Sequence, residues 1–349
     1  MKKLTLLSLF IVFSLQASFA QTNKELAATK LKEAIKLEDE DGKYDEALVL
    51  ILEAQKLDPE SYTYPFELAY TYNAKKEYQK AIDYLLPLLK HRDVSDETYQ
   101  SLGNNYDYLE QPTKAIDTYQ KGLLLYPNSG KLNTEMGNMY LIDKKLTQAL
   151  EYYEKSIKLD PQYSPAYYRA AKLYLNGKEE EVWGMIYGEI YMNLNRNSDR
   201  TEEMSKLLYD TYKSEITFPA AGQVGVSFSK STKRLPNQVV NGRSPFPMIY
   251  EQGLITGSST EQAIDINSLS RIRTTGLGYY SMLDAQVPIK NILFDYQTKV
   301  KNAGHLDAYN HWILLKGDET AFNTWQADNQ AKWDAFITWF RQNGLEIAK

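Results

Sequence analysis

The segment Leu102–Pro127 has the sequence LGNNYDYLEQPTKAIDTYQKGLLLYP, and further along the chain Met136–Pro161 has the sequence MGNMYLIDKKLTQALEYYEKSIKLDP. Glycine, asparagine, tyrosine, alanine and proline recur at the same places in both segments. The same spacing extends outward in three columns. These are Ala47, Ala81, Ala115 and Ala149; Tyr72, Tyr106, Tyr140 and Tyr174; and Pro59, Pro127 and Pro161, with Asp93 in the gap. Several columns that share one period indicate an internal repeat of about 34 residues.

These residues resemble the tetratricopeptide repeat, a unit of about 34 residues that forms two antiparallel helices. The family pattern has a small residue at position 8, tyrosine at 11, alanine at 20, an aromatic or apolar residue at 24 and proline at 32. Counted in this way, the repeats begin at Ala28, Tyr62, Asp96, Gly130 and Ser164. The resemblance implies a mostly α-helical solenoid of about five hairpins within residues 21–213. Acidic residues that follow Ser198 predict one closing helix over residues 198–213.

Elementary packing accounts for the columns. Glycine or alanine at positions 8 and 20 lets two helices approach closely, and proline at position 32 cannot continue a helix. A single hairpin cannot bury its apolar face alone, so the repeats must stack. Departures from the pattern are Ile35 and Glu38 in the first repeat, Pro87 in the second, and Trp183 with Asn195 in the fifth. We expect the first repeat to be a polar cap, Pro87 to kink or shorten its helix, and Trp183 to force two helices apart or change their angle.

The first twenty residues have the pattern of a cleavable secretory signal. Lys2 and Lys3 supply positive charge, residues 4–15 are largely apolar, and residues 17–20 offer small side chains for cleavage after Ala20. This apolar run is too short for a membrane-spanning helix, which needs about 20 residues. We therefore expect a periplasmic or secreted protein with no membrane span after cleavage. A retained membrane anchor is the alternative.

Composition excludes several classes of function. The chain of 349 residues has no cysteine, which excludes disulfides, thiol catalysis and thiolate zinc sites. Its formal charge is −5, and loss of Lys2 and Lys3 with the signal would lower it to −7. Such a chain lacks the positive surface that nucleic acid requires, so we expect no nucleic-acid partner. The 28 tyrosines suit half-buried positions between stacked helices.

Residues 214–349 lack the period and are predicted to form a separate, mainly helical domain with a short β element. Proline and glycine are frequent between Pro219 and Gly257, and alternation over residues 224–229 predicts a β-strand. Helices are expected over residues 267–283, 289–301, 306–315 and 319–342. Four of the five tryptophans lie in this domain. Rings at helical spacing usually form a core, although an exposed platform for a sugar or peptide is the alternative.

Few residues point to catalysis. No phosphate-binding loop, G-x-S-x-G elbow or H-E-x-x-H helix occurs in the sequence. The acidic run over residues 38–41 lacks the spacing of a calcium loop. His305 and His311 lie six residues apart, which does not place them on one helix face, and with Asp307 they are the only candidates for an acid–base or metal site. We expect no catalytic residue, no metal and no other cofactor.

In the tetratricopeptide-repeat family, positions 2, 5, 9, 12 and 13 of the first helix of each repeat line the concave face. The resemblance therefore implies a partner-binding groove in this chain. Its candidate residues are Phe66, Tyr70, Asn73, Gln100, Asn104, Asp107, Tyr108, Thr134, Asn138, Tyr168, Lys172 and Asn176. Asparagine amides can both donate to and accept from an extended peptide backbone. An ordinary polar surface is the alternative.

One binding mode of the family can be tested residue by residue. A clamp for a carboxyl terminus would need lysine, asparagine, asparagine, lysine and arginine where this chain has Gln100, Asn104, Glu135, Pro165 and Arg169. Two of the five match, and Glu135 would repel a carboxylate, so we reject this mode. The favoured hypothesis is a non-catalytic, exported scaffold that binds a protein or peptide. An enzyme in the C-terminal domain with the repeats as docking module, and a self-associating envelope component, are the alternatives.

Overall fold

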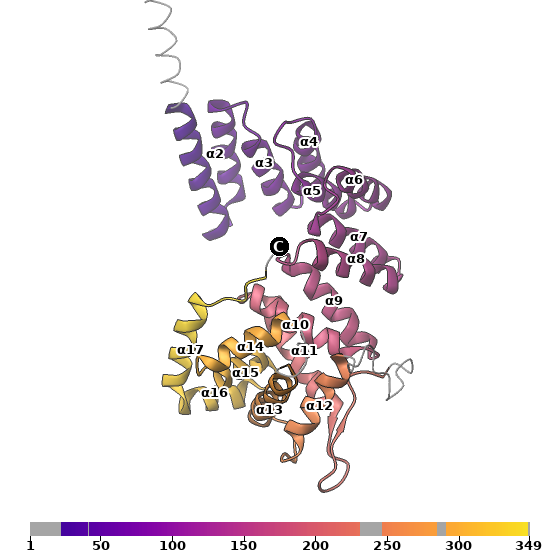
Figure 1. Ribbon diagram of the computed structural model, residues 1–349. Helices are drawn as coiled ribbons and strands as arrows, with labels where there is room; N and C mark the ends of the chain where they lie inside the picture. The colour runs from indigo at the N-terminus through magenta and orange to yellow at the C-terminus, as the bar shows by residue number, and fades with distance from the viewer. Residues whose placement is uncertain (1–21, 41, 231–245, 285–290, 348–349) are drawn as a thin grey trace, which may run out of the picture. The chain divides into compact units, whose positions relative to one another are not determined.

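The computed structural model describes residues 22–40, 42–230, 246–284 and 291–347 (Figure 1). The predicted signal over residues 1–20 lies outside these ranges. The chain divides into two compact units, which we call the N-terminal unit (residues 1–143) and the C-terminal unit (residues 144–349). The division falls between the two helices of the fourth predicted repeat.

The N-terminal unit is built of helical hairpins. Its helices are one over residues 22–40, α2 (Tyr44–Leu57), α3 (Thr63–Ala74), α4 (Tyr78–Leu88), α5 (Asp96–Tyr108), α6 (Pro112–Leu125) and α7 (Gly130–Ile142). The first helices of the second, third and fourth repeats begin at Thr63, Asp96 and Gly130, within one residue of the predicted starts. The predicted solenoid fold and the phase of its repeats are therefore confirmed.

The alanine column marks tight helix crossings. Ala47, Ala81 and Ala115 are fully buried in the N-terminal unit, and Ala149 is fully buried in the C-terminal unit. Gly103 of α5 faces Tyr119 of α6 so closely that a Cβ atom on the glycine would lie 2.1 Å from Cε1 of the tyrosine. The contact between α5 and α6 therefore requires the small residue at position 8.

A further column of the repeat is conformational. The residues with left-handed backbone at position 15 are Gly42, Lys76, Glu110, Lys144 and Lys178, which recur once in each repeat and have φ between 55° and 61°. In the third repeat, the amide of Gln111 donates to the carbonyl of Tyr106 at 2.9 Å across this turn. That bond closes the end of α5 in the manner of a Schellman motif. Four of the five positions hold residues other than glycine, so the column is hidden in the sequence.

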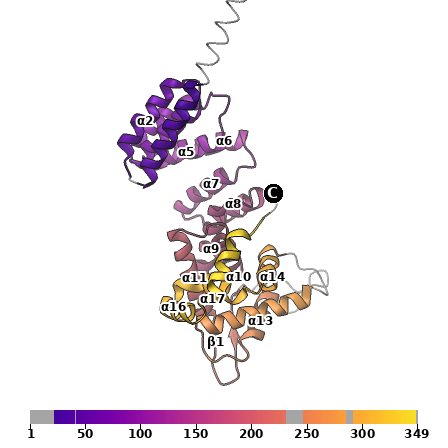
Figure 2. The ribbon, with the colours of Figure 1, turned by 90° about the vertical axis from the view of Figure 1, so that its left-hand side faces the viewer.

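The C-terminal unit begins with α8 (Leu146–Leu159), α9 (Ser164–Gly177), α10 (Glu181–Leu194) and the predicted closing helix, α11 (Asp199–Glu215). Two short strands follow, β1 (Ile216–Thr217) and β2 (Gly225–Val226), which pair antiparallel. The remaining elements are α12 (Phe246–Ser258), α13 (Ile266–Asp284), α14 (Ile292–Asn302), α15 (Leu306–Leu314), the 3-10 helix η1 (Leu315–Gly317), α16 (Glu319–Asp328) and α17 (Gln330–Gln342). With 19 residues, α13 is the long orange helix of Figure 2.

One hydrophobic core extends through the C-terminal unit, from the fifth repeat to the last helices. Tyr212 and Ile216 lie on either side of the predicted domain boundary after residue 213, and both belong to this core. The rings of Trp312, Trp325 and Phe336 are buried. The aromatic residues near the C-terminus therefore form a core, as expected, and these rings offer no exposed platform.

Predictions were least accurate for the residues around β2 and for α12. The strand expected over residues 224–229 has only two residues, and α12 was not predicted, because its proline and glycines are typical of turns. In the structure the glycines permit a close helix contact. A Cβ atom on Gly257 would lie 2.5 Å from the carbonyl oxygen of Ile272 in α13.

Three further expectations concern helix geometry. The helix expected over residues 319–342 is divided into α16 and α17 at Asn329. Pro87 lies in the last turn of α4, which has 11 residues where α6 has 14. Trp183 stacks on Phe246, whereas Gly184 makes the close contact with α9. Trp183 therefore does not force α9 and α10 apart, because the glycine beside it takes the position of closest approach. The alternative, that Trp183 changes the angle between these helices, stays a prediction.

Candidate functional site

The predicted groove residues of the N-terminal unit lie on α3, α5 and α7, the first helices of three successive repeats. We call this surface the helix-A face, and define it by Phe66, Tyr70, Asn73, Gln100, Asn104, Asp107, Tyr108 and Asn138. Tyr70 and Tyr108 are exposed, with 59% and 53% of their surfaces accessible. The other six side chains are half-buried. Thr134, also expected in the groove, is buried and adds no surface.

Hydrogen bonds join the third and fourth repeats across this face. Glu135 of α7 accepts from Gln100 of α5 at 2.7 Å through one carboxylate oxygen, and from Asn138 at 2.8 Å through the other. The hydroxyl of Tyr119 donates to Oδ1 of Asn104 at 2.6 Å. The structure thus brings together three of the predicted residues. Glu135 and Tyr119, which hold them, were not predicted as groove residues, although their places at positions 6 and 24 of the repeat could have found them.

Two predicted residues contact other side chains of the repeats, Asn73 in the neighbouring repeat and Phe66 within its own. The amide nitrogen of Asn73 donates to Oδ1 of Asn105, which is fully buried, at 3.0 Å. The ring of Phe66 stacks on that of Tyr62, with ring centres 5.5 Å apart. These side chains therefore support the helix-A face more than they extend from it.

Acidic side chains on or beside this face lack cationic partners. Burial raises the pKa of Glu67, and the nearby carboxylates of Glu38 and Glu97 raise it further. Burial also raises the pKa of Asp107. Among the residues that the structure describes, none of Glu67, Asp107 and Glu135 forms an ion pair. The helix-A face therefore combines accessible rings and amides with uncompensated negative charge.

The candidates in the fifth repeat are placed differently. Tyr168 is only 4% exposed, and its hydroxyl donates to Glu203 of the closing helix α11. Lys172 forms an ion pair with the same carboxylate at 2.6 Å. Asn176 is exposed near the end of α9. Within the C-terminal unit, α11 therefore occupies Tyr168 and Lys172, two of the side chains that the repeat pattern offered to a partner.

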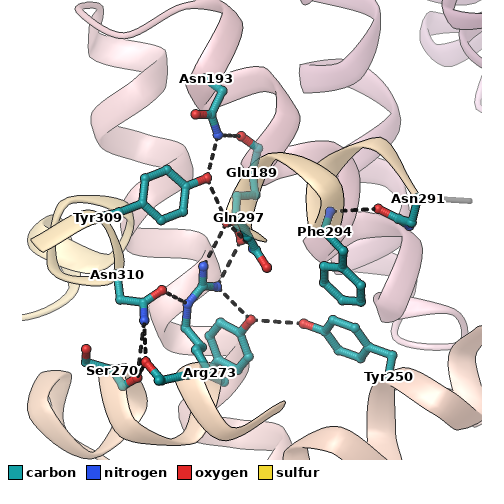
Figure 3. A network of polar contacts seen from close by, with 12 residues as sticks. Glu189, Asn193, Tyr250, Ser270, Arg273, Asn291, Phe294, Gln297, Tyr309 and Asn310 are labelled. Carbon is teal, nitrogen blue, oxygen red and sulfur yellow. Dashed lines mark hydrogen bonds and ion pairs between the residues drawn. The ribbon is translucent and has the colours of Figure 1, made fainter. Parts of the chain in front are cut away.

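A polar cluster that the sequence did not predict is buried in the C-terminal unit (Figure 3). Arg273 of α13 donates from Nη1 and Nη2 to the two carboxylate oxygens of Glu189 of α10, at 2.9 and 2.7 Å. Its Nε donates to Asn310 of α15 at 2.8 Å. Glu189 also accepts from Gln297 and Tyr309. The cluster joins the last repeat to α13, α14 and α15.

The space beside this cluster is small. A cavity of about 30 Å³ borders Arg273, Glu189 and Tyr250, which is room for a water molecule but not for a substrate. Both charged groups of the cluster are paired with each other. We therefore interpret the cluster as structural.

The three catalytic candidates do not meet in one cleft. His311 is buried and stacks on Trp325 at 3.9 Å, and its Nε2 lies 3.1 Å from Oδ1 of Asn267. Hydrogen bonds from His311 and Ser270 lower the pKa of Asp307 to about 2. His305 packs instead beside the ring of Trp339, and burial lowers its pKa. This arrangement gives no support to the alternative hypothesis of an acid–base site.

Two more properties concern the part of the chain that the structure describes. Within it, no group of three or more His, Cys, Asp or Glu side chains is placed to hold a metal ion. None of its helices combines the length and apolar character needed to cross a membrane.

Comparison with known proteins agrees with the helical pattern. Residues 96–129 and 131–163 match one model of the tetratricopeptide repeat, and residues 32–91 match a second model of the same repeat. The chain therefore contains tetratricopeptide repeats within residues 32–163. The matches cover the first four repeats of the tetratricopeptide-repeat array. The fifth, α9 with α10, lies beyond the matched residues. No curated protein matches the chain.

Solved structures with a similar arrangement of helices include other tetratricopeptide-repeat proteins. A crystal structure of MamA is 23% identical, covers 46% of this chain and 92% of its own, and has a TM-score of 0.36. YrrB, described as having an unusual peptide-binding site, is 22% identical over 52% of this chain and 92% of its own, with a TM-score of 0.34. PilF from Pseudomonas aeruginosa is 19% identical, covers 55% of this chain and 86% of its own, and has a TM-score of 0.44. At these scores the likeness carries no argument about function.

Proposed function

We propose that the protein is an interaction scaffold whose helix-A face binds a protein partner through an extended segment of that partner. The tetratricopeptide repeat is a module of protein–protein interaction, and its stacked hairpins present one continuous surface. Tyr70 and Tyr108 provide rings on this surface that are half open to solvent. Aromatic side chains of this kind contribute much of the binding energy at protein interfaces.

The charge of the face selects the kind of segment. Glu67 and Asp107 are half-buried carboxylates with raised pKa values, and neither forms an ion pair with a described residue. Burial and repulsion between carboxylates destabilise their ionised form. A lysine or arginine of a partner would stabilise that form again. The bound segment is therefore basic. The observation that carries this proposal is that α3 and α5 each combine a half-buried carboxylate with an exposed tyrosine.

A selection of displayed random peptides on the purified protein tests the proposal. Enriched peptides carry lysine or arginine, and their affinity falls as salt is raised. A variant with Glu67→Gln, Asp107→Asn and Glu135→Gln binds them at least about tenfold more weakly, because several charge-assisted contacts are lost together. A control with Glu46→Gln, Asp117→Asn and Glu151→Gln removes the same charge from exposed positions and keeps the affinity. Enrichment of neutral or acidic peptides, or equal losses in the two variants, would refute the proposal.

We also propose that the chain is exported and cleaved after Ala20. The supporting observation is the sequence alone: Lys2 and Lys3, then an apolar run and small residues at the cleavage site. Cell fractionation followed by N-terminal sequencing of the mature protein tests this, with Gln21 as the expected first residue. A cytoplasmic protein that keeps Met1 or Lys2 at its amino terminus would rule it out.

A further inference from the structure

A second surface of the N-terminal unit is hollowed. A cavity of about 420 Å³ lies between α2, α3 and α4, and no residue of the helix-A face lines it. Its walls include Glu60, Asp83, Tyr84, Pro87, Leu88 and His91. The volume falls within the range of pockets that hold small molecules or single side chains.

Two acidic residues, Asp83 and Glu60, are among the residues that line this cavity. Pro87 has no amide hydrogen, so it cannot donate the usual helical bond to the carbonyl of Asp83 one turn earlier. The carboxylate of Asp83 accepts one bond, at 2.9 Å, from the neutral amide of Gln79. In the described part of the chain, neither Asp83 nor Glu60 forms an ion pair. Two carboxylates and a backbone carbonyl therefore border the cavity without a cation.

The other walls of the cavity suit a flat, partly apolar cation. Tyr84 lines it and stacks on Tyr72, with ring centres 5.6 Å apart, while Leu88 provides a buried apolar wall. His91 accepts a hydrogen bond from the amide of Asp93 through Nδ1, at 3.1 Å. Its Nε2 is free to donate to the carbonyl of Glu60, 3.2 Å away.

We propose that this cavity binds an arginine side chain of a protein partner. A guanidinium group donates several hydrogen bonds in one plane, pairs with carboxylates through two nitrogens and stacks on aromatic rings. The acceptors of Asp83 and Glu60, with the ring of Tyr84, match each of these properties. A lysine ammonium would satisfy the charge but not the planar contact. This site is separate from the helix-A face and does not depend on the function proposed for that face.

Saturation-transfer NMR on the full chain tests the site with an acetylated Gly-Ser-Arg-Ser-Gly amide. Its neutral control carries citrulline, which has nearly the shape of arginine but no charge. We expect saturable transfer to the arginine methylene protons and none to citrulline. Asp83→Asn raises the dissociation constant at least about tenfold, since a charge-assisted pair is lost. Equal binding of the citrulline peptide, or no saturable signal from the arginine peptide, would overturn the proposal.

Matched variants distinguish binding in this cavity from a general effect of the protein's negative charge. Asp117 has the same place in the third repeat that Asp83 has in the second, is exposed, and is followed one helical turn later by Lys121 in place of proline. Asp117→Asn therefore changes the charge equally and leaves the affinity within about twofold. Pro87→Ala returns an amide donor to the Asp83 carbonyl; it weakens binding while raising the melting temperature. Two outcomes would show that the peptide binds elsewhere. One is a loss of affinity in Asp117→Asn as large as that in Asp83→Asn, and the other is an equal loss in the double variant Tyr70→Ala and Tyr108→Ala.

Discussion

Arg273 and Glu189 form a two-pronged ion pair inside the C-terminal unit, and the side chains are only 6% and 4% exposed. They lie 84 residues apart in the chain. Additional donors and acceptors from α11, α14 and α15 surround the pair (Figure 3). Removal of one partner would leave a buried charge uncompensated.

Glu189→Gln is therefore expected to lower the free energy of unfolding by about 3–5 kcal/mol, the usual cost of breaking a buried pair. Urea titration monitored by circular dichroism measures the loss. The matched control is Glu261→Gln, which breaks the two-pronged pair between Arg271 and Glu261, where Arg271 is 61% exposed. It should cost about 1 kcal/mol or less. Equal losses in the two variants would contradict a structural role for the buried cluster.

Gly103→Ala is expected to destabilise the N-terminal unit by about 1–3 kcal/mol, because the added methyl group overlaps the ring of Tyr119. The measurement is the shift of the thermal or urea transition. Gly177 of α9 is the control, since a Cβ atom there meets nothing within 4 Å. Gly177→Ala should be neutral or slightly stabilising, as expected for alanine in a helix. A tolerated Gly103→Ala would mean that α5 and α6 are not in tight contact.

Lys76→Gly should leave the free energy of unfolding unchanged or raise it by up to about 1 kcal/mol. The reason is that glycine adopts the left-handed backbone of position 15 without steric cost. The same change at Lys121, which is exposed within α6, should destabilise by about 1 kcal/mol. Hydrogen exchange of the amides in the two turns would locate each effect. Similar destabilisation by both changes would show that the turn at Lys76 does not require a positive φ.

The carboxylate of Asp307 should contribute stability that depends on pH. Hydrogen bonds from His311 and Ser270 lower its pKa from an ordinary value of 3.8 to about 2. Because the folded pKa is depressed, the stabilisation is complete above pH 3.8 and disappears as pH falls toward 2. The side chain is 45% exposed, so solvent screening limits the contribution to about 1 kcal/mol.

Asp307→Asn should therefore lose about 1 kcal/mol at pH 7 and differ little from the parent protein near pH 2. Denaturant titrations at a series of pH values measure this difference. Asp334→Asn, at an exposed position on α17, serves as control and should change stability little at any pH. A loss for Asp307→Asn that does not vary with pH would show that its charge is not what stabilises the fold.

The repeat phase was predictable because it depends on side-chain size alone. A helix crossing that admits only alanine or glycine, such as Ala81 or Gly103, leaves a small residue at the same position of most repeats. The column at position 15 was not predictable, since its requirement is a backbone angle that lysine and glutamate can also adopt at a modest cost. The glycines of α12 were misinterpreted for the opposite reason: the same residue permits either a turn or a close helix contact.

For the candidate site, the sequence predicted which helix faces point outward but not which side chains are already occupied. Tyr70 and Tyr108 are open to solvent, as a groove requires, whereas Tyr168 is tied to Glu203 of a helix outside the repeat pattern. Asn73 is used by the neighbouring Asn105. Hydrogen bonds of this kind depend on side-chain rotamers and on residues far away in the chain. They do not recur with the repeat, so the repeat pattern cannot predict them.

The continuous core of the C-terminal unit limits how the chain can be shortened. A fragment that stops after residue 213 would expose Tyr209 and Tyr212, which now pack beside Gly317 of η1 and Tyr250 of α12. Such a fragment should aggregate, whatever the stability of its hairpins, because stacked repeats need a polar outer end to remain in solution. In this protein the last third of the sequence covers the apolar end of the repeats. A truncation that keeps every repeat but removes this part is therefore expected to prevent folding.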